Sequence, residues 1–401
     1  MEKSLHSNIW KYTLFLVVNK RIFVAILGAY YLTIPNVTPE GIGIILLAGS
    51  LGGFIFEIPS GYIADKIGHK TALVMSRVFM LFSTIFFLMA NNIILLIFGG
   101  VLMSVAQSFL SGTGKAFMHE TLRGLKREKD YVRIMGKISS IGFAVPIIFM
   151  VLIPFLVSIS FKIPFLIALI FDVIGILVAV SFVTPSVTQK ETEELKLTTF
   201  KQVIHEGIRL HFFGFALFSG IISGVLFGVG GFRAPYQLFL AIPVIWYGVF
   251  FGIGRMFASL MLAYSGKIRE RISLFSFYKF QIFLYTLLIL ILGFISTWWI
   301  VVAVFIVINS FQWGLSGVSN GYLIDIIKAS KFKATLLSIQ SQIKQLVAAI
   351  ASFGIGFTIE RLSYQYGFLY LGIIFFAILF PLYVYLNNRY AKIDAALAGG
   401  R

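Results

Sequence analysis

The chain has 401 residues, of which 59% are hydrophobic and 12% are charged, and its mean hydropathy is +0.94. A soluble domain needs far more charge to cover its surface, so this composition excludes a soluble globular protein and indicates lipid as the solvent. The formal net charge of +17 does not indicate nucleic-acid binding, because the basic residues lie in short segments between apolar runs. The absence of cysteine excludes disulfides, thiol catalysis and cysteine metal sites.

Apolar runs recur along the chain at the length of a membrane-spanning helix. A hydrocarbon core of ~30 Å requires about 20 helical residues, and lipid requires every backbone group to be satisfied within the protein. Runs such as IILLIFGGVLM do not alternate in polarity, which argues against a β-barrel. The sequence therefore predicts an all-α integral membrane protein with about twelve transmembrane helices. We expect them at residues 12–34, 39–64, 70–90, 93–122, 134–159, 163–183, 211–233, 243–264, 275–296, 298–325, 334–359 and 366–388.

Lysine and arginine are distributed unequally among the connecting loops. The loops after the second, fourth, sixth, eighth and tenth predicted helices are basic, whereas Lys162 and Arg361 stand nearly alone in the alternate loops. Cytoplasmic loops of membrane proteins carry the excess of Lys and Arg, so both termini and the basic loops are expected to be cytoplasmic. We expect a multi-pass protein of a cell membrane, of the prokaryotic inner-membrane type.

The longest polar segment divides the predicted helices into two sets of six. We expect an N-terminal six-helix lobe at residues 1–183, a cytoplasmic linker at 184–210 and a C-terminal six-helix lobe at 211–401. The stretch TQKETEELK within the linker indicates either a solvated connection or a short surface helix. Two equal helix bundles joined by a central cytoplasmic linker are typical of a two-lobed transporter.

The loop after the second predicted helix carries the most specific motif, Gly61-Tyr-Ile-Ala-Asp65-Lys-Ile-Gly68-His69-Lys70. It resembles the signature G-x-x-x-D-x-x-G-[RK]-[RK] of the major facilitator superfamily, with His69 as the departure. The preceding EIPSG and the later KATLLS at 333–338 resemble runs of the drug-exporter-like, drug–proton antiporter branch. The resemblance implies the major facilitator fold, in which two pseudo-symmetric six-helix lobes move relative to one another.

The resemblance also implies a conformational clasp in this loop. In the family the acid of the motif, here Asp65, caps the helix that would start near Ala334, where unpaired N–H groups and the helix dipole favour an anion. A cation at His69 or Lys70 can pair with Glu120 at the end of the fourth predicted helix. Gly61 would allow a neighbouring helix to approach closely. His69 would make the clasp sensitive to pH, or it is a neutral residue beside a charged Lys70.

Several ionisable residues lie inside the apolar runs, where a charge is costly and usually functional. Asp172, Arg255 and Lys344 are expected near mid-depth, where the two cations would line a cavity or pair with Asp172. The long side chains of Lys20, Arg21, Arg77 and Arg233 are expected to reach the headgroups. Lys115 and Arg233 are further candidates for a substrate cavity. Glu57 and Lys115 are expected nearer the cytoplasmic face.

The run at 334–359 carries a polar stripe beside Lys344. Ser338, Ser341, Gln342 and Gln345 recur at spacings of three and four residues, which places them on one side of a helix. A polar stripe facing lipid would serve no purpose, so Ser341, Gln342 and Gln345 are candidates for lining a substrate cavity. Hydrogen bonding between helices without a cavity is the alternative.

These features predict a secondary active transporter that works by alternating access. The resemblance makes proton-coupled efflux of an amphipathic organic compound or drug the leading hypothesis, with Asp172 and Glu57 as candidate proton carriers. The excess of embedded cations favours a second hypothesis, an anionic metabolite transporter or lipid flippase. A passive channel or membrane scaffold is the alternative from another class.

No phosphate-binding loop, metal-ligand cluster or catalytic constellation occurs in the sequence, so we expect no cofactor, no metal, no enzyme activity and no nucleic-acid partner. The expected partners are a small-molecule substrate, protons and the lipid bilayer, and the protein is expected to be a monomer.

Overall fold

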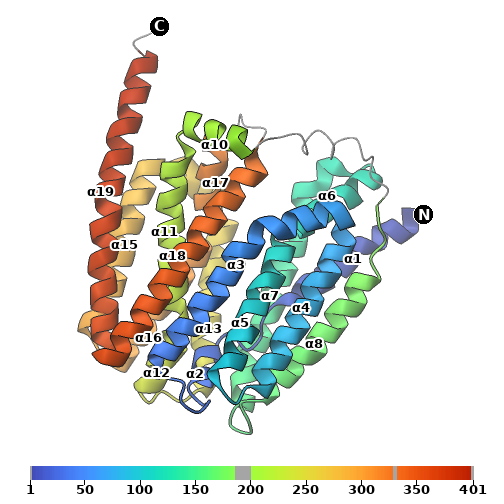
Figure 1. Cartoon of the computed structure of the whole chain (residues 1–401). Coiled ribbons are helices and arrows are strands. Elements are labelled where there is room, and N and C mark those ends of the chain that lie inside the picture. The colour runs from blue at the N-terminus through green and yellow to red at the C-terminus, as the bar shows by residue number, and fades with distance from the viewer. Residues whose placement is uncertain (1, 186–199, 328–331, 399–401) are drawn as a thin grey trace. The chain divides into compact units, whose positions relative to one another are not determined.

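A computed structural model describes residues 2–185, 200–327 and 332–398 of the chain (Figure 1). The described residues form helices joined by short connections, and no strand occurs among them. The chain divides into two compact units. Unit 1 comprises Met1–Thr198 with Ala241–Gly252, and unit 2 comprises Thr199–Leu240 with Ile253–Arg401. The stretch TQKETEELK of the predicted linker lies outside the described residues.

Unit 1 contains the helices of the first half of the chain. Their bounds are α1 Glu2–Asn19, α2 Leu27–Tyr31, α3 Pro39–Ile67, α4 His69–Met89, α5 Ile93–Ser111, α6 Thr113–Gly124, the 3₁₀ turn Glu128–Asp130, α7 Tyr131–Leu156 and α8 Ile163–Val180. The helix α3 packs along α5, α5 packs along α4, and α4 packs along α8. The buried side chain of Asn8 holds α1 to the end of α8, because it donates to the carbonyl of Val183 at 2.8 Å and accepts from its N–H at 2.9 Å.

Unit 2 contains the helices of the second half. Their bounds are α10 Phe200–Arg209, α11 Phe212–Gly231, α12 Arg233–Phe239, α13 Ile245–Ala263, α14 Ser265–Arg271, α15 Leu274–Phe294, α16 Trp298–Gly314, α17 Ser316–Ile326, α18 Lys333–Arg361 and α19 Tyr364–Ala398. The first turns of α13, up to Gly252, belong to unit 1. Within unit 2, α11 lies along α18 and α15 lies along α19 (Figure 1).

Local sequence explains where several of these helices begin. Thr38 caps α3 by accepting a hydrogen bond from the N–H of Gly41, and Pro39 occupies the first helical position, where its missing N–H costs nothing. The side chain of Asn92 caps α5 by accepting a hydrogen bond from the N–H of Leu95 at 3.2 Å.

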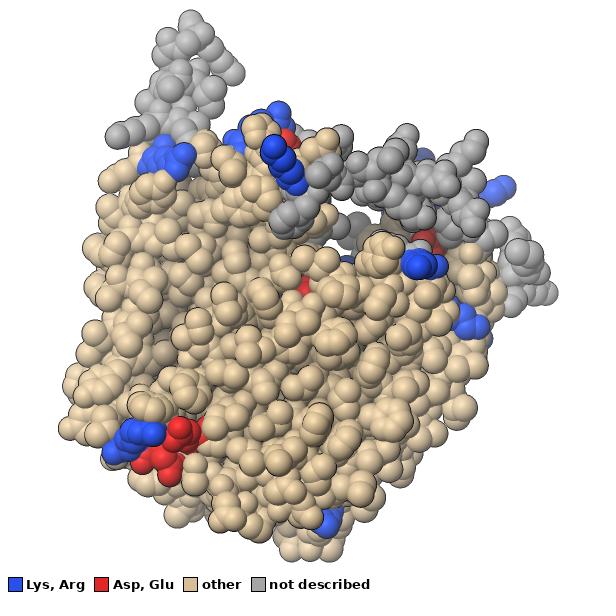
Figure 2. All heavy atoms as spheres, viewed as in Figure 1, with Lys and Arg blue, Asp and Glu red and all other residues tan. Residues whose placement is uncertain are grey.

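By length and composition, eleven helical segments of the described residues can cross a membrane. In Figure 2 most of the visible surface is formed by residues other than Lys, Arg, Asp and Glu. The all-α membrane fold is thus confirmed.

The helix predicted at 12–34 is not continuous. The chain leaves the helical conformation after Asn19 and passes through turns before α2 begins at Leu27. Shorter interruptions separate α5 from α6 at Gly112, α11 from α12 at Phe232 and α16 from α17 at Leu315. These breaks matter for function, because backbone that departs from the helix at membrane depth must find partners other than lipid.

Candidate functional site

The centre of unit 1 is a buried charge network around Asp172 on α8. The guanidinium of Arg21 donates to both carboxylate oxygens, at 2.7 Å to Oδ1 and 3.0 Å to Oδ2. Arg77 on α4 donates to Oδ1 at 2.6 Å, and the hydroxyl of Thr84 donates to Oδ2 at 2.5 Å. The side chain of Asp172 has no solvent exposure. Four hydrogen bonds, three of them from the two cations, therefore hold the carboxylate in place.

The same network supports the break after α1. Arg21 lies in the non-helical stretch, and its guanidinium donates to the carbonyl of Asn19 and to that of Val18, both at 3.4 Å. Arg77 donates to the carbonyl of Val18 at 3.4 Å and to the side-chain oxygen of Asn19. Cations at a helix C-terminus satisfy its last carbonyls and interact favourably with the helix dipole.

The sequence predicted that the side chains of Arg21 and Arg77 reach the lipid headgroups. This prediction is wrong, because both side chains are directed to Asp172 inside unit 1. Arg77 is completely buried and Arg21 is 8% exposed. Both pair with Asp172, so the expected partners of this acid, Arg255 and Lys344, are replaced by two cations of its own unit. Sequence spacing cannot identify partners on distant helices, which explains the difference.

Gly175 provides the space that the Arg77 side chain occupies. A Cβ added at Gly175 would lie 2.5 Å from Nε of Arg77 and 2.8 Å from its Nη2. Gly175 follows Asp172 by three residues on α8, so both face the same side of that helix. The absence of a side chain at 175 lets the guanidinium lie against α8 while it reaches the carboxylate.

The signature loop joins α3 to α4. The backbone of Gly68 has a φ of 91°, a conformation that favours glycine, which explains why the motif has glycine at this position. Nε2 of His69 lies 3.1 Å from Oε1 of Glu120 on α6, which is the pairing expected from the sequence. Lys70 is half-buried beside it. A Cβ at Gly61 would meet no atom within 4 Å among the described residues, and the side chain of Asp65 is outside what the structure describes.

Glu57 and Lys115 lie on α3 and α6 of unit 1. Glu57 is half-buried on α3 and accepts a hydrogen bond from the hydroxyl of Ser111 at 3.3 Å. Lys115 is exposed on α6, and its carbonyl accepts from the hydroxyl of Tyr131 at 3.5 Å. Burial raises the pKa of Tyr131 above its ordinary value, so this hydroxyl stays protonated.

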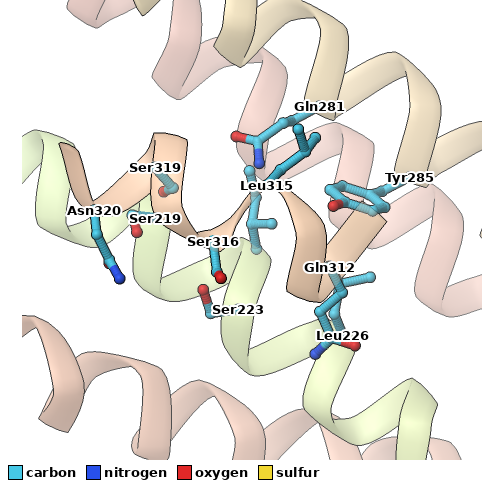
Figure 3. Close-up of a pocket in the computed structure, with 11 residues that line it drawn as sticks. Ser219, Ser223, Leu226, Gln281, Tyr285, Gln312, Leu315, Ser316, Ser319 and Asn320 are labelled. Atoms are coloured by element: carbon cyan, nitrogen blue, oxygen red, sulfur yellow. The ribbon is translucent and has the colours of Figure 1, made fainter. Parts of the chain in front are cut away.

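Unit 2 contains a polar cavity of about 60 Å³ among α11, α15, α16 and α17 (Figure 3). Eight of its eleven lining residues are polar, and all eight are uncharged. In Figure 3 the side chains of Ser223 on α11 and Ser316 on α17 point toward one another. The lining residues are Ser219, Ile222, Ser223, Leu226, Gln281, Tyr285, Gln312, Leu315, Ser316, Ser319 and Asn320.

Hydrogen bonds hold the polar walls of this cavity. The amide of Gln340 on α18 donates to the hydroxyl of Ser219 at 3.3 Å. Gln281 and Tyr285, one turn apart on α15, are hydrogen-bonded to each other. A cavity of this size and polarity has room and partners for water or for polar groups of a ligand.

The predicted cavity residues do not line this space. Arg233 is buried on α12, Arg255 is half-buried on α13, and the stripe of Ser341, Gln342, Lys344 and Gln345 is half-buried on α18. A signal for the observed lining was present in the sequence, because polar pairs recur one helical turn apart in three helices. These pairs are Ser219 with Ser223, Gln281 with Tyr285, and Ser316 with Asn320.

Comparisons with known proteins agree with this architecture. A model of the Major Facilitator Superfamily matches residues 12–352. A mutant of the nucleoside transporter NupG has a similar structure, with a TM-score of 0.77, 12% identity, and 95% of this chain and 98% of that chain covered. A POT family transporter in complex with 5-aminolevulinic acid has a TM-score of 0.69, with 14% identity and coverage of 94% and 95%.

At these identities the similar structures show the fold alone, and a comparison with curated proteins gives no match. The family match extends over most of the chain and spans both units. The protein is thus a membrane transporter and not an enzyme. It belongs to the major facilitator superfamily.

Proposed function

We propose that this transporter is a proton-coupled secondary carrier of a small polar organic solute, working by alternating access with the cavity of unit 2 as a solute-binding site. The observation that carries the proposal is the lining of that cavity, where eight of eleven residues are polar. Polar groups within a membrane-spanning unit are costly unless protein, water or solute satisfies them. Their uncharged character favours a solute region rich in hydrogen-bonding groups.

Glu57 is the better candidate for the proton carrier. A carrier carboxylate must exchange partners during the cycle, whereas the carboxylate of Asp172 accepts four hydrogen bonds from side chains of its own unit and has no solvent exposure. Glu57 is half-buried on α3 and shares a hydrogen bond with Ser111 across to α5. Asp172 then serves to hold the break in the first membrane helix. Both termini are proposed to be cytoplasmic, because the basic loops lie on that side.

Reconstituted protein tests the proposal. Proteoliposomes under an imposed pH gradient are offered a panel of labelled polar, amphipathic and charged solutes. We expect uphill accumulation of at least one polar solute, which collapses with the gradient. Glu57→Gln should lose gradient-driven accumulation and retain solute exchange at equal concentrations, while the exposed control Glu128→Gln keeps both. Accumulation that never exceeds equilibration would indicate a channel and contradict the proposal.

Efflux of an amphipathic drug is the second candidate function. The runs EIPSG at 57–61 and KATLLS at 333–338 favour it, because they resemble those of exporter-like relatives. The same flux assay separates the two candidates. Uphill movement of lipophilic cationic dyes, with no movement of polar solutes, would favour drug efflux over the polar-solute proposal.

A further inference from the structure

Two serines in the polar cavity of unit 2 are held in place by other parts of the protein. The hydroxyl of Ser219 accepts a hydrogen bond from the amide of Gln340 at 3.3 Å. The hydroxyl of Ser316 donates to the carbonyl of Trp313 at 2.6 Å. Ser219 therefore keeps a proton that it can donate, and Ser316 keeps a lone pair that can accept. The cavity thus has two fixed hydroxyls, one available as a donor and one as an acceptor.

Four other polar side chains of the lining have no such bond. Within the part of the chain that the structure describes, no residue is hydrogen-bonded to the side chains of Ser223, Gln312, Ser319 and Asn320. Each of these side chains carries at least one donor and at least one acceptor. Because they line a cavity, water or a solute in that cavity is the partner available to them.

The two amides of this set flank the centre of the cavity. Gln312, Ser316 and Asn320 follow one another at intervals of four residues along α16 and α17. The connecting residue Leu315 has a φ of −88° and a ψ of −3°, close to helical values, so the three side chains share one side of this stretch. In Figure 3 the side chain of Ser223 points toward Ser316 from α11. In the same view the amides of Gln312 and Asn320 lie to either side of this serine pair (Figure 3).

The size and the charge of the cavity limit what it can hold. Its volume of about 60 Å³ corresponds to about four to six water-sized groups, because one water needs about 10–15 Å³. Two neighbouring carbons with a hydroxyl on each have about this size. None of the described residues that line the cavity is charged. A charged group would enter without a counter-charge, which is costly in a membrane-spanning unit, so the cavity favours a neutral group.

We propose that the cavity binds an uncharged vicinal diol, the unit shared by open-chain polyols and sugars, and that Gln312 and Asn320 select it. The inference rests on the proposed transport function and names its solute class. A hydroxyl both donates and accepts, so two neighbouring hydroxyls can pair with both polar atoms of an amide. A carboxylate only accepts and an ammonium group only donates, so either one leaves amide atoms unpaired. Unpaired polar groups in a site built for hydroxyls are the physical basis of strong discrimination.

Competition binding with a matched three-carbon series tests the solute class. Radiolabelled glycerol is equilibrated by dialysis with purified protein, in a detergent that has no sugar headgroup. The unlabelled competitors are glycerol, glycerate as the anion, serinol as the cation, and trimethylene glycol, which lacks the middle hydroxyl. We expect saturable glycerol binding, with each of the other three competing at least tenfold more weakly than glycerol. Competition by glucose as strong as that by glycerol would extend the site to sugars, and its absence would restrict the site to open-chain polyols.

Substitutions at the two amides test their role. Gln312→Leu and Asn320→Leu should each weaken glycerol binding tenfold or more. Gln312→Glu keeps the size of the side chain and adds a negative charge, so it should shift the preference from glycerol toward serinol by tenfold or more. A glutamine with a purely structural role would produce no such shift. Gln202→Glu, at an exposed position of α10, is the matched control and should change neither affinity. Unfolding temperatures and gel-filtration profiles show which variants are folded.

The outcomes for the diol and for transport are separable. Absence of saturable glycerol binding, equal competition by glycerate or trimethylene glycol, or wild-type glycerol affinity in folded Gln312→Leu and Asn320→Leu variants would overturn the diol assignment. Uphill transport of another polar solute, abolished by Ser223→Leu, would in that case leave the transport function intact. Glycerol binding that depends on Gln312, without uphill transport of any solute, would overturn the transport function alone.

Discussion

Arg77 and Asp172 form an ion pair of 2.6 Å in which neither side chain is exposed to solvent. The pair joins α4 to α8, and Arg21 completes it from the break after α1. Two cations and one anion leave the cluster with a formal charge of +1. Such a cluster is stable in a membrane-spanning unit when most of its donors find acceptors, and the carbonyls of the interrupted helix α1 supply some of them. Among the described residues, Nε of Arg77 has no hydrogen-bond partner.

Removing the acid of this cluster should destabilise the protein strongly. Asp172→Asn keeps the shape of the side chain and leaves two buried guanidiniums without their counter-charge. Breaking a buried ion pair by removing one partner costs about 3–5 kcal/mol, so we expect a clear fall in the unfolding temperature measured by tryptophan fluorescence in detergent. Asp130→Asn is the matched control, because its pair with Arg127 is exposed and such pairs contribute about 0–1 kcal/mol. Equal unfolding temperatures for the two variants would show that the buried pair is dispensable.

A methyl group at position 175 should displace Arg77. Gly175→Ala places a Cβ where the guanidinium lies, and overpacking of this kind costs about 1–3 kcal/mol. Gly136→Ala on α7 is the control, because its Cβ would meet no atom within 4 Å and alanine favours a helix by about 0.5–1 kcal/mol. The unfolding temperature should fall for Gly175→Ala and stay level or rise for Gly136→Ala. A stabilised Gly175→Ala variant would contradict the packing described here.

The pair of His69 and Glu120 should make the stability of unit 1 depend on pH. Imidazole is the side chain whose charge ordinarily changes between about pH 5 and 8, so the ionic attraction of His69 to the carboxylate of Glu120 is strongest at the acidic end of this range and fades as the pH rises. The loss of stability caused by Glu120→Gln should therefore be larger at pH 5.5 than at pH 8. In a His69→Arg background, where the charge is permanent, the loss should be the same at both values. A wild-type background that shows the same loss at both pH values would mean that His69 does not change charge in this pair.

The sequence predicted the membrane helices well because their apolar length is a direct consequence of the lipid thickness. The pairing of His69 with Glu120 was also predictable, because the motif resemblance placed both residues at the same end of their helices. The break after Asn19 was not predicted, since the run from Leu14 to Leu32 is apolar around Asn19, Lys20 and Arg21 and its interruption depends on Arg77 and Asp172 from distant helices.

The cavity of unit 2 was missed for a different reason. The sequence pointed to charged residues at mid-depth and to the polar stripe of Ser341, Gln342 and Gln345. The polar part of the observed lining consists instead of serines, amides and a tyrosine on other helices, and their signal is weak in any single helix. Only the fold brings the pairs on α11, α15 and α17 to one place. Arg255 was predicted to lie at mid-depth, but its stacking on Trp313 depends on the contact between α13 and α16, which sequence spacing does not reveal.

The most direct test of the solute site is to fill the cavity and measure transport. Ser223→Leu puts a larger apolar side chain where Ser223 and Ser316 point toward one another (Figure 3). Ser276→Leu, at an exposed position at the start of α15, is the control for folding and reconstitution. Proteoliposomes with each variant are compared for uphill solute accumulation under a pH gradient. We expect accumulation to fall tenfold or more for Ser223→Leu and to remain near wild type for Ser276→Leu, whereas wild-type accumulation by Ser223→Leu would contradict the assignment of this cavity to the solute.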